Sequence, residues 1–462
     1  MTCRDAVGLF TPVCIEAPAP LAAQASYALG ELLRGLGLRA EPVRRGDAAL
    51  YVGTAPEAAP PSALRLRLST APMARRPEEL GWLVHDGARW PLPVGPVGDH
   101  DDAGGIVEAD IVRSAFWWLA GVQELGAPTD VHGRFPYEGS LQHRLGDAPG
   151  GALRPAVDAY RRWLGDALGR RGIAVPGRDW GGHGWAVALT HDLDAPAERR
   201  LRALLAETGR GRPLRALRRA FGPDRRRRST QELVALGEAL GARPTVFVKT
   251  GDGAPEDLRL PRRDPAMQAL LRSGRVETGL HPSFAAYDDP RRLGEERDRL
   301  AALVGAPTGL VRMHYLRWRE PASPGLVARA GFAVDATLGF SEAPGYRRGT
   351  AFPFRLWNHA HASPAPVWEA PLTVMDTTLR RLHDADMGAY AEALRDAVGS
   401  ARAVGGCAVV LAHNDPGEGA PWQRRLRALR EVVAEAASGG ARVGGLGEVL
   451  GAWGVEASPQ SA

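Results

Sequence analysis

The chain has 462 residues, of which 44% are hydrophobic and 24% charged, a balance that is typical of globular proteins and excludes a disordered chain. A single hydrophobic core seldom grows to this size, so we expect two domains. The net charge is +5, but Lys249 is the only lysine among 58 basic residues, which indicates a coding bias toward arginine; we therefore expect no nucleic-acid partner.

Cysteines and apolar runs set further limits. The 3 cysteines are odd in number and show no CxxC or Cys/His spacing, which argues against a disulfide scaffold and a structural zinc site. The first residues contain no apolar core of signal-peptide length, and no run approaches the ~18 uninterrupted apolar residues of a membrane span. We expect a protein without a membrane span that is located in the cytoplasm.

The N-terminal part of the chain predicts a small α/β domain. Apolar residues at helical spacing predict a helix over residues 22–38, and a short strand follows at 48–52. A second helix is predicted over 110–125, which contains two adjacent tryptophans. We expect this accessory domain to cover residues 1–145.

A linker and a second pattern follow. Proline and glycine flank a helix predicted at 156–170, so residues 146–182 read as a linker with a helix. In residues 183–455, short apolar runs alternate with helix-length segments, which predicts a parallel sheet. The number of runs favours a (β/α) barrel over a doubly wound sheet, and no GxGxxG motif supports the latter. The runs cover residues 186–192, 244–250, 276–281, 310–315, 332–337, 368–376 and 407–415.

Polar side chains occur where several of these runs end. In parallel α/β barrels, the carboxyl ends of the strands form the active-site face, so we expect these side chains to lie near one another. They are His191, Asp192 and Asp194 on the first run, His281 on the third, His314 on the fourth, Asp335 on the fifth and His413 on the seventh.

Asp192 and Asp194 are two residues apart, and alternate residues of an extended strand face the same side. Neighbouring carboxylates serve a metal ion or acid–base chemistry, but an aspartate also commonly caps a following helix, and the sequence leaves both readings open. Two further polar residues close runs: Lys249 on the second, and Asp376 on the sixth, which we expect to cap a helix.

An arginine-rich segment interrupts the pattern after the first run. Residues 199–228 contain twelve arginines and end in four consecutive ones. Such a segment is either a solvated helix or insertion, or a patch that binds a polyanion.

Five short motifs in chain order resemble those of the polysaccharide deacetylases (carbohydrate esterase family four). The similarity is greatest to a bacterial branch that carries an N-terminal domain of unknown function, whose recurring segments resemble residues 114–116 (SAF) and 132–136 (HGRFP). The five motifs are THDLD at 190–194, ETGLHPS at 277–283, VRMHY at 311–315, DATLGF at 335–340 and LAHN at 411–414.

The resemblance implies a distorted (β/α)7 barrel that hydrolyses an N-acetyl or O-acyl group of a poly- or oligosaccharide. It implies that Asp192 is the catalytic base, that Arg312 pairs with this base, and that His413 is the general acid. We expect a carbohydrate substrate to contact the matched residues His314, Tyr315 and Asp335, and also Trp318, which follows the fourth run and could line a sugar groove or simply pack.

The resemblance also implies a divalent metal, most simply zinc, held by Asp194 and His281. Where the family has its second metal histidine, this chain has Ala285. Catalytic zinc usually has three protein ligands, so Ser283, His191 or His314 would have to complete the set.

Two alternatives remain at the level of sequence. The first is a non-catalytic carbohydrate-binding or scaffold protein on the same fold, which would need no metal. The second is a polyanion binder that uses the arginine-rich segment, whose binding would weaken steeply with salt.

Overall fold

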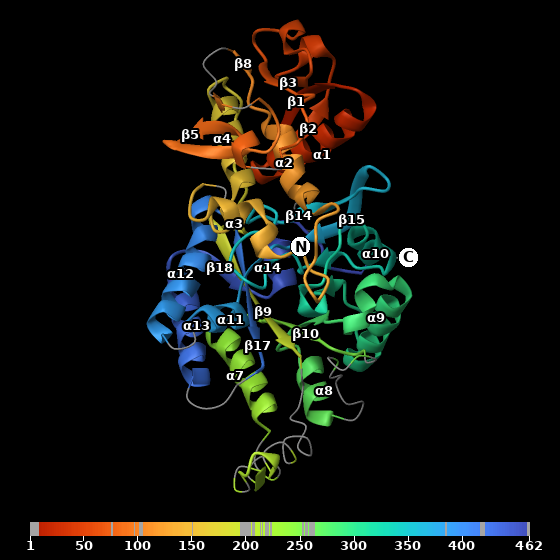
Figure 1. Ribbon diagram of the computed structural model, residues 1–462, viewed down its shortest axis with the longest axis vertical. Helices are drawn as coiled ribbons and strands as arrows, with labels where there is room; N and C mark the ends of the chain where they lie inside the picture. Colours follow the sequence, from red (N-terminus) through yellow and green to blue (C-terminus); the bar gives the residue numbers. More distant parts are fainter. Residues whose placement is uncertain are drawn as a thin grey trace.

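Figure 1 shows the computed structural model of the chain, in which a red-to-orange N-terminal half is stacked on a green-to-blue half along the long axis. The structure describes residues 9–459 apart from 75–76, 97, 101–104, 150, 195–204, 206–207, 213, 215, 218–220, 222–223, 252–253, 255–256, 258–263, 384–385 and 416–420. Within these ranges, no helix is long and apolar enough to cross a membrane. Much of the arginine-rich segment lies outside the described residues.

Two small sheets form the N-terminal half. The first is parallel, with the strand order β2-β1-β3-β4-β8, and the second has the order β6-β5-β7. The strands are β1 Leu9–Glu16, β2 Leu38–Pro42, β3 Leu50–Gly53, β4 Leu64–Arg67, β5 Gly81–His85, β6 Ala88–Leu92, β7 Gly98–His100 and β8 Ile106–Val107.

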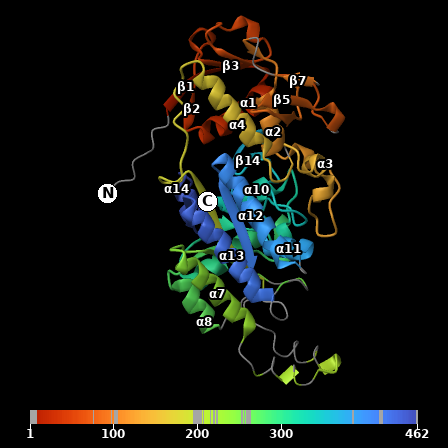
Figure 2. The ribbon, with the colours of Figure 1, turned by 90° about the vertical axis from the view of Figure 1, so that its left-hand side faces the viewer.

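Three helices of the N-terminal half pack against one another: α1 (Ala19–Gly35), α2 (Ile111–Leu119) and α4 (Ala156–Gly169). Each confirms a helix predicted from the sequence, with ends shifted by a few residues. Figure 2 shows α4 alongside α1 and α2, so the helix of the predicted linker packs with the N-terminal half. A further short helix, α3 (Leu141–Leu145), lies between them in sequence.

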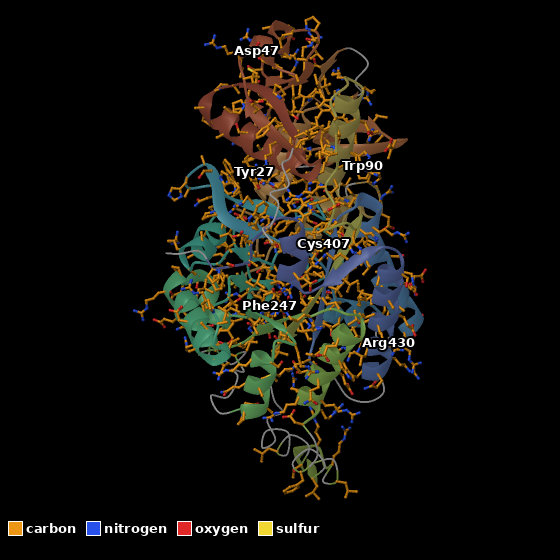
Figure 3. All side chains as sticks on the ribbon, turned by 180° about the vertical axis from the view of Figure 1, so that it is seen from behind. Tyr27, Asp47, Trp90, Phe247, Cys407 and Arg430 are labelled. Atoms are coloured by element: carbon orange, nitrogen blue, oxygen red, sulfur yellow. The ribbon has the colours of Figure 1, made fainter. Side chains whose placement is uncertain are left out.

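Helix α2 is apolar on almost all sides because it lies between the two halves of the molecule. Its Phe116 ring packs edge-on against Trp357, with centroids 5.1 Å apart, and Tyr27 of α1 lies 5.0 Å from the same indole. The Tyr27 hydroxyl also donates to the carbonyl of Arg355. Figure 3 labels Tyr27 at this junction, where the halves share one hydrophobic core.

Over the described residues, the second half contains a ten-stranded sheet with the order β14-β15-β13-β12-β11-β10-β9-β17-β16, and β18 pairs with β9. All pairs are parallel except that of β14 with β15. The strands are β9 Trp185–Leu193, β10 Thr245–Val248, β11 Glu277–Leu280, β12 Leu310–Val311, β13 Val334–Asp335, β14 Phe354–Asn358, β15 Ser363–Glu369, β16 Leu372–Met375, β17 Cys407–His413 and β18 Ala441–Gly444.

The sheet curls because β15 and β16 are successive parts of one segment. Only Ala370 and Pro371 separate them, and proline has no N–H to continue a ladder. β15 pairs with β13, whereas β16 pairs with β17 from the other end of the strand order. All of the predicted apolar runs contain strands, and the mixed α/β architecture agrees with expectation; β14 and β18 were not predicted.

Helices surround this sheet, and Figure 2 shows α12 and α13 together on its outer side. Aspartates cap α7, α8, α9 and α12 by accepting bonds from backbone N–H groups of the first turn. The helices are α7 Arg225–Ala239, α8 Pro265–Arg272, α9 Pro290–Val304, α10 Ser323–Arg329, α11 Asp376–His383, α12 Met387–Val404, α13 Pro421–Ser438 and α14 Leu446–Ala452.

A buried ion-pair network joins the two halves. Glu124, from the N-terminal half, accepts two hydrogen bonds from the Arg347 guanidinium, at 2.9 and 2.6 Å. Arg348 lies 3.4 Å from the same carboxylate and donates to Glu320 at 2.7 Å. These side chains are at most 3% exposed, so each charge depends on its partners for compensation.

We predict that Glu124→Gln lowers the free energy of unfolding by about 3–5 kcal/mol, because it leaves two buried guanidinium groups with one carboxylate fewer. Urea denaturation followed by circular dichroism measures the loss. The matched control is Glu435→Gln, which breaks the exposed pair with Arg395 and should cost less than about 1 kcal/mol. Equal losses in the two variants would contradict the assignment.

Candidate active site

A cavity of about 340 Å³ lies at the carboxyl ends of the strands of the large sheet. Asp192, Asp194, His281, His314 and His413 line it, so side chains from four strand ends meet there as the sequence predicted. The other lining residues are His132, Arg134, Met313, Tyr315, Leu316, Ser341, Met375, Thr377, Arg381 and Leu411.

Arg312 fixes the orientation of Asp192. Its Nη1 donates to Oδ1 of Asp192 at 3.0 Å and to Oγ1 of Thr190 at 2.9 Å, and its Nε donates to the carbonyl of Ala336 at 2.9 Å. The guanidinium is fully buried and lies over the ring of Phe247, which Figure 3 labels. The second oxygen of Asp192, Oδ2, lies 3.7 Å from His281 Nε2.

Asp194, His281 and His314 form a group whose potential ligand atoms all lie within 4.8 Å of one another. Oδ1 of Asp194 lies 3.2 Å from Nε2 of His281 and 3.6 Å from Nε2 of His314. The Nδ1–H of His281 donates to the Arg312 carbonyl at 2.7 Å, which leaves Nε2 available as a ligand. Oδ1 of Asp194 is buried without a hydrogen-bond partner. These residues therefore fit a divalent metal with three protein ligands.

His314 offers this group an imidazole nitrogen, which Ala285 lacks. Burial is the main reason that the pKa of His314 is lowered to about 4, so the ring is neutral near pH 7, as a ligand must be. Its Nδ1 lies 3.6 Å from Asp257, and the fully buried Lys249 Nζ lies 2.8 Å from Nε2 and 3.0 Å from Nδ1. Burial likewise lowers the pKa of Lys249.

The two other ligands considered from the sequence are occupied elsewhere. Ser283 Oγ donates to Glu296 at 2.6 Å. His191 Nδ1 lies 3.2 Å from the carbonyl of Ala412, the ring does not line the cavity, and burial lowers its pKa to about 4. Alternation along β9 explains this, because His191 faces the side opposite to its neighbour Asp192.

Desolvation alone would raise the pKa of Asp194, but the nearby imidazoles of His281, His413 and His314 hold it well below the usual range. A carboxylate that stays ionised in a set of imidazoles is suited to binding a cation.

His413 is paired with Asp376, the first residue of α11. Nδ1 of the imidazole lies 2.6 Å from Oδ1 of Asp376, and Nε2 lies 3.9 Å from Oδ2 of Asp194. Burial opposes protonation, but the charge and hydrogen bond of Asp376 outweigh it and raise the pKa of His413 to about 10. His413 therefore holds a proton at neutral pH.

Asp376 is the functional candidate that the sequence analysis missed. It was expected only to cap a helix, and it does begin one, but its carboxylate also holds the His413 imidazole. The signal that selected Asp192, a carboxylate at the end of an apolar run, applies equally to Asp376.

Two of the expected substrate contacts lie away from the cavity. Trp318 is 1% exposed, and its indole N–H donates to Glu320 at 2.9 Å. Asp335 is fully buried, accepts bonds from Thr337, and has a pKa raised by burial. Tyr315, in contrast, lines the cavity and is 38% exposed.

A second group of possible ligands, His85, Asp86 and Asp166, lies in the N-terminal half. Both of its carboxylates are exposed, an arrangement that is common without a metal. It is not connected with the cavity described above.

The solved structures that are similar to this chain include the following two. One, from Mycobacterium smegmatis and provisionally described as a polysaccharide deacetylase, is 19% identical, with 61% of this chain and 94% of that chain covered and a TM-score of 0.42. The other is a peptidoglycan N-acetylglucosamine deacetylase in complex with 4-naphthalen-1-yl-N-oxidanyl-benzamide, which is 13% identical, with 62% and 94% covered and a TM-score of 0.33. No family model and no curated protein matches the sequence. Because these similarities are low, we base the functional conclusion on the geometry of the site.

We predict that His314→Ala weakens zinc binding by more than the ~10- to 100-fold that typically follows loss of an outer-shell partner. Titration calorimetry of the purified, chelator-treated protein measures the affinity. The control is His361→Ala, which removes an exposed imidazole and should leave zinc binding unchanged. If His314→Ala binds zinc as tightly as the wild type, the metal group lacks this ligand.

Proposed function

We propose that this protein is a metal-dependent hydrolase that removes an N-acetyl or O-acyl group from a poly- or oligosaccharide. One observation carries the proposal: Asp192, held by Arg312, and His413, held by Asp376, lie in one cavity with the group formed by Asp194, His281 and His314. The motif order in the sequence supports the same reaction, and we propose that the curled sheet is a distorted (β/α)7 barrel.

The chemistry needs a base, an acid and an electrophile. A divalent ion at Asp194, His281 and His314 would polarise the acyl carbonyl and lower the pKa of an attacking water. Zinc suits this mixture of imidazole and carboxylate ligands best.

Asp192 is placed to accept the proton of the attacking water. Arg312 holds Oδ1, so Oδ2 is the oxygen free to receive it. His413 holds a proton at Nε2, on the side of the ring opposite to Asp376. It delivers this proton to the departing amine, which is otherwise a poor leaving group. The products are the free carboxylic acid and the amino sugar. A proton then passes from Asp192 through solvent to His413, which returns both side chains to their starting protonation states.

We propose that catalysis and accessory functions belong to different regions of the chain. Residues 183–455 would form the catalytic barrel, with the predicted linker and residues 1–145 as an accessory unit. A non-catalytic carbohydrate-binding protein is the alternative, and it predicts oligosaccharide binding without turnover or metal dependence.

We predict that the purified protein releases acetate from N-acetylated oligosaccharides in the presence of zinc and that Asp192→Asn lowers the rate at least about 100-fold, because the base is lost. An enzyme-coupled acetate assay on a panel of glycans measures this. The matched control, Asp47→Asn, changes an exposed aspartate far from the cavity and should leave the rate unchanged. Asp192→Asn turnover within a few-fold of the wild type would refute the assignment.

We predict that His413→Ala lowers kcat on an amide substrate by ~10²- to 10⁴-fold, the usual contribution of a positioned acid. An activated ester, whose leaving group needs no protonation, should be hydrolysed nearly normally by the same variant. Comparing the two substrates, with the melting temperature as a check on folding, separates an acid from a structural histidine. Equal losses on amide and ester would exclude the general-acid role.

A further inference from the structure

The segment 130–134 of the N-terminal half reaches into the catalytic cavity. It overlaps the HGRFP stretch at residues 132–136, which has no role in the proposed reaction. Asp130 holds the segment in a tight turn: its carboxylate accepts from the backbone N–H groups of His132 and Arg134 at 2.9 Å each and from Arg134 Nε at 2.8 Å. The turn therefore presents His132 and Arg134 as a fixed unit, and both line the cavity.

Several contacts hold this unit against the barrel half, among them an ion pair in which Arg134 Nη2 lies 3.8 Å from Glu342 Oε1 and an edge-on contact between the rings of His132 and Phe284. Arg134 Nη1 donates to the carbonyl of Tyr315 at 3.3 Å, and Arg317 Nε donates in the other direction to the carbonyl of His132 at 2.7 Å. The ring of His132 lies over that of Tyr315, with centroids 4.8 Å apart and planes inclined by 33°. The contacts with Tyr315 and Arg317 meet on the turn that follows β12 and carries His314.

That turn has an unusual backbone. Tyr315 and Leu316 adopt φ angles of 61° and 54°, in the left-handed region that residues with a Cβ atom seldom occupy. Such a conformation persists only where the surroundings hold it. The Arg134 bond to the Tyr315 carbonyl acts directly on this backbone, and the conformation directs the neighbouring His314 and Tyr315 side chains into the cavity.

The stacked rings of His132 and Tyr315 also form a surface of the cavity, and Tyr315 remains 38% exposed. Flat rings with an exposed face are suited to packing against the apolar face of a sugar ring. One ring comes from each half of the molecule.

We propose that residues 130–134 take part in substrate binding in two ways. Arg134 positions the turn at Tyr315 and Leu316, and the His132 ring forms, together with Tyr315, a surface on which a sugar ring of the substrate stacks. The identity of the ligand as a sugar rests on the proposed function. The N-terminal half is then part of the carbohydrate site, and not only an accessory unit.

Hydrogen–deuterium exchange tests the positioning role without any substrate. Arg134→Met keeps the length of the side chain but removes its donors, and it should speed exchange of the amides at residues 313–318 at least about 10-fold, because the turn loses the contact that holds it. The matched control is Arg162→Met, an exposed arginine of α4, which should leave this exchange unchanged. Unchanged exchange in Arg134→Met would overturn the positioning role.

Calorimetric binding of an N-acetylglucosamine tetramer tests the stacking surface. His132→Ala should weaken binding about 10-fold, and His132→Phe, which restores a flat ring, should recover most of it. Melting temperatures within a few degrees of the wild type show that folding is preserved. Wild-type affinity in His132→Ala, no recovery in His132→Phe, or no binding to the wild type would each overturn the stacking role of His132.

The two proposals fail in different ways. If the wild type binds the tetramer and His132→Ala weakens this binding, but no acetate is released, the proposed hydrolytic function is wrong and the substrate-binding role of residues 130–134 is retained. If acetate is released and the variants at His132 and Arg134 behave as the wild type in hydrogen–deuterium exchange and tetramer binding, the proposed role of residues 130–134 is wrong and the hydrolytic function is retained.

Discussion

The arrangement of the site depends on the hydrogen bonds that the buried guanidinium of Arg312 makes. From its place just after β12, Arg312 donates to Asp192 and Thr190 on β9 and to Ala336 just after β13, while its backbone carbonyl accepts from His281 beyond β11. A buried charge that has no contact with water must be compensated by nearby polar groups. For Arg312 these groups belong to residues at the carboxyl ends of the strands that form the site. The same contacts that satisfy the arginine therefore set the relative positions of Asp192 and His281, the proposed base and one of the proposed metal ligands.

The positions of strands in the second half were predictable because a buried parallel sheet needs continuous apolar runs. For the same reason Asp192, Asp194, His281 and His413 could be placed together: polar residues at the carboxyl ends of such runs have one edge in common. The strands β14 and β18 were not predicted because neither contains a continuous apolar run: β14 has the sequence FRLWN and forms an antiparallel hairpin with β15, and β18 has the sequence ARVG.

The parts of the site that the sequence did not reveal depend on which side of the backbone a residue faces. Trp318 and Asp335 occur at the expected places along the chain, but their side chains turn into buried hydrogen bonds with Glu320 and Thr337. Motif order gives the position along a strand or loop, and one residue of shift reverses the face. His314 was expected near the other polar strand ends and was considered as a third ligand, but its exact position beside Asp194 and His281 depends on a turn that has no sequence periodicity.

The single lysine of the chain has a practical consequence. Lys249 is fully buried beside His314, so the folded protein presents no side-chain amine to solvent among its described residues. Amine-directed reagents that modify exposed lysines in most proteins have only one side chain to modify here, and they reach it only when the structure around Lys249 opens locally. The extent of acylation at Lys249 therefore measures how often this part of the protein, next to His314, is open to solvent.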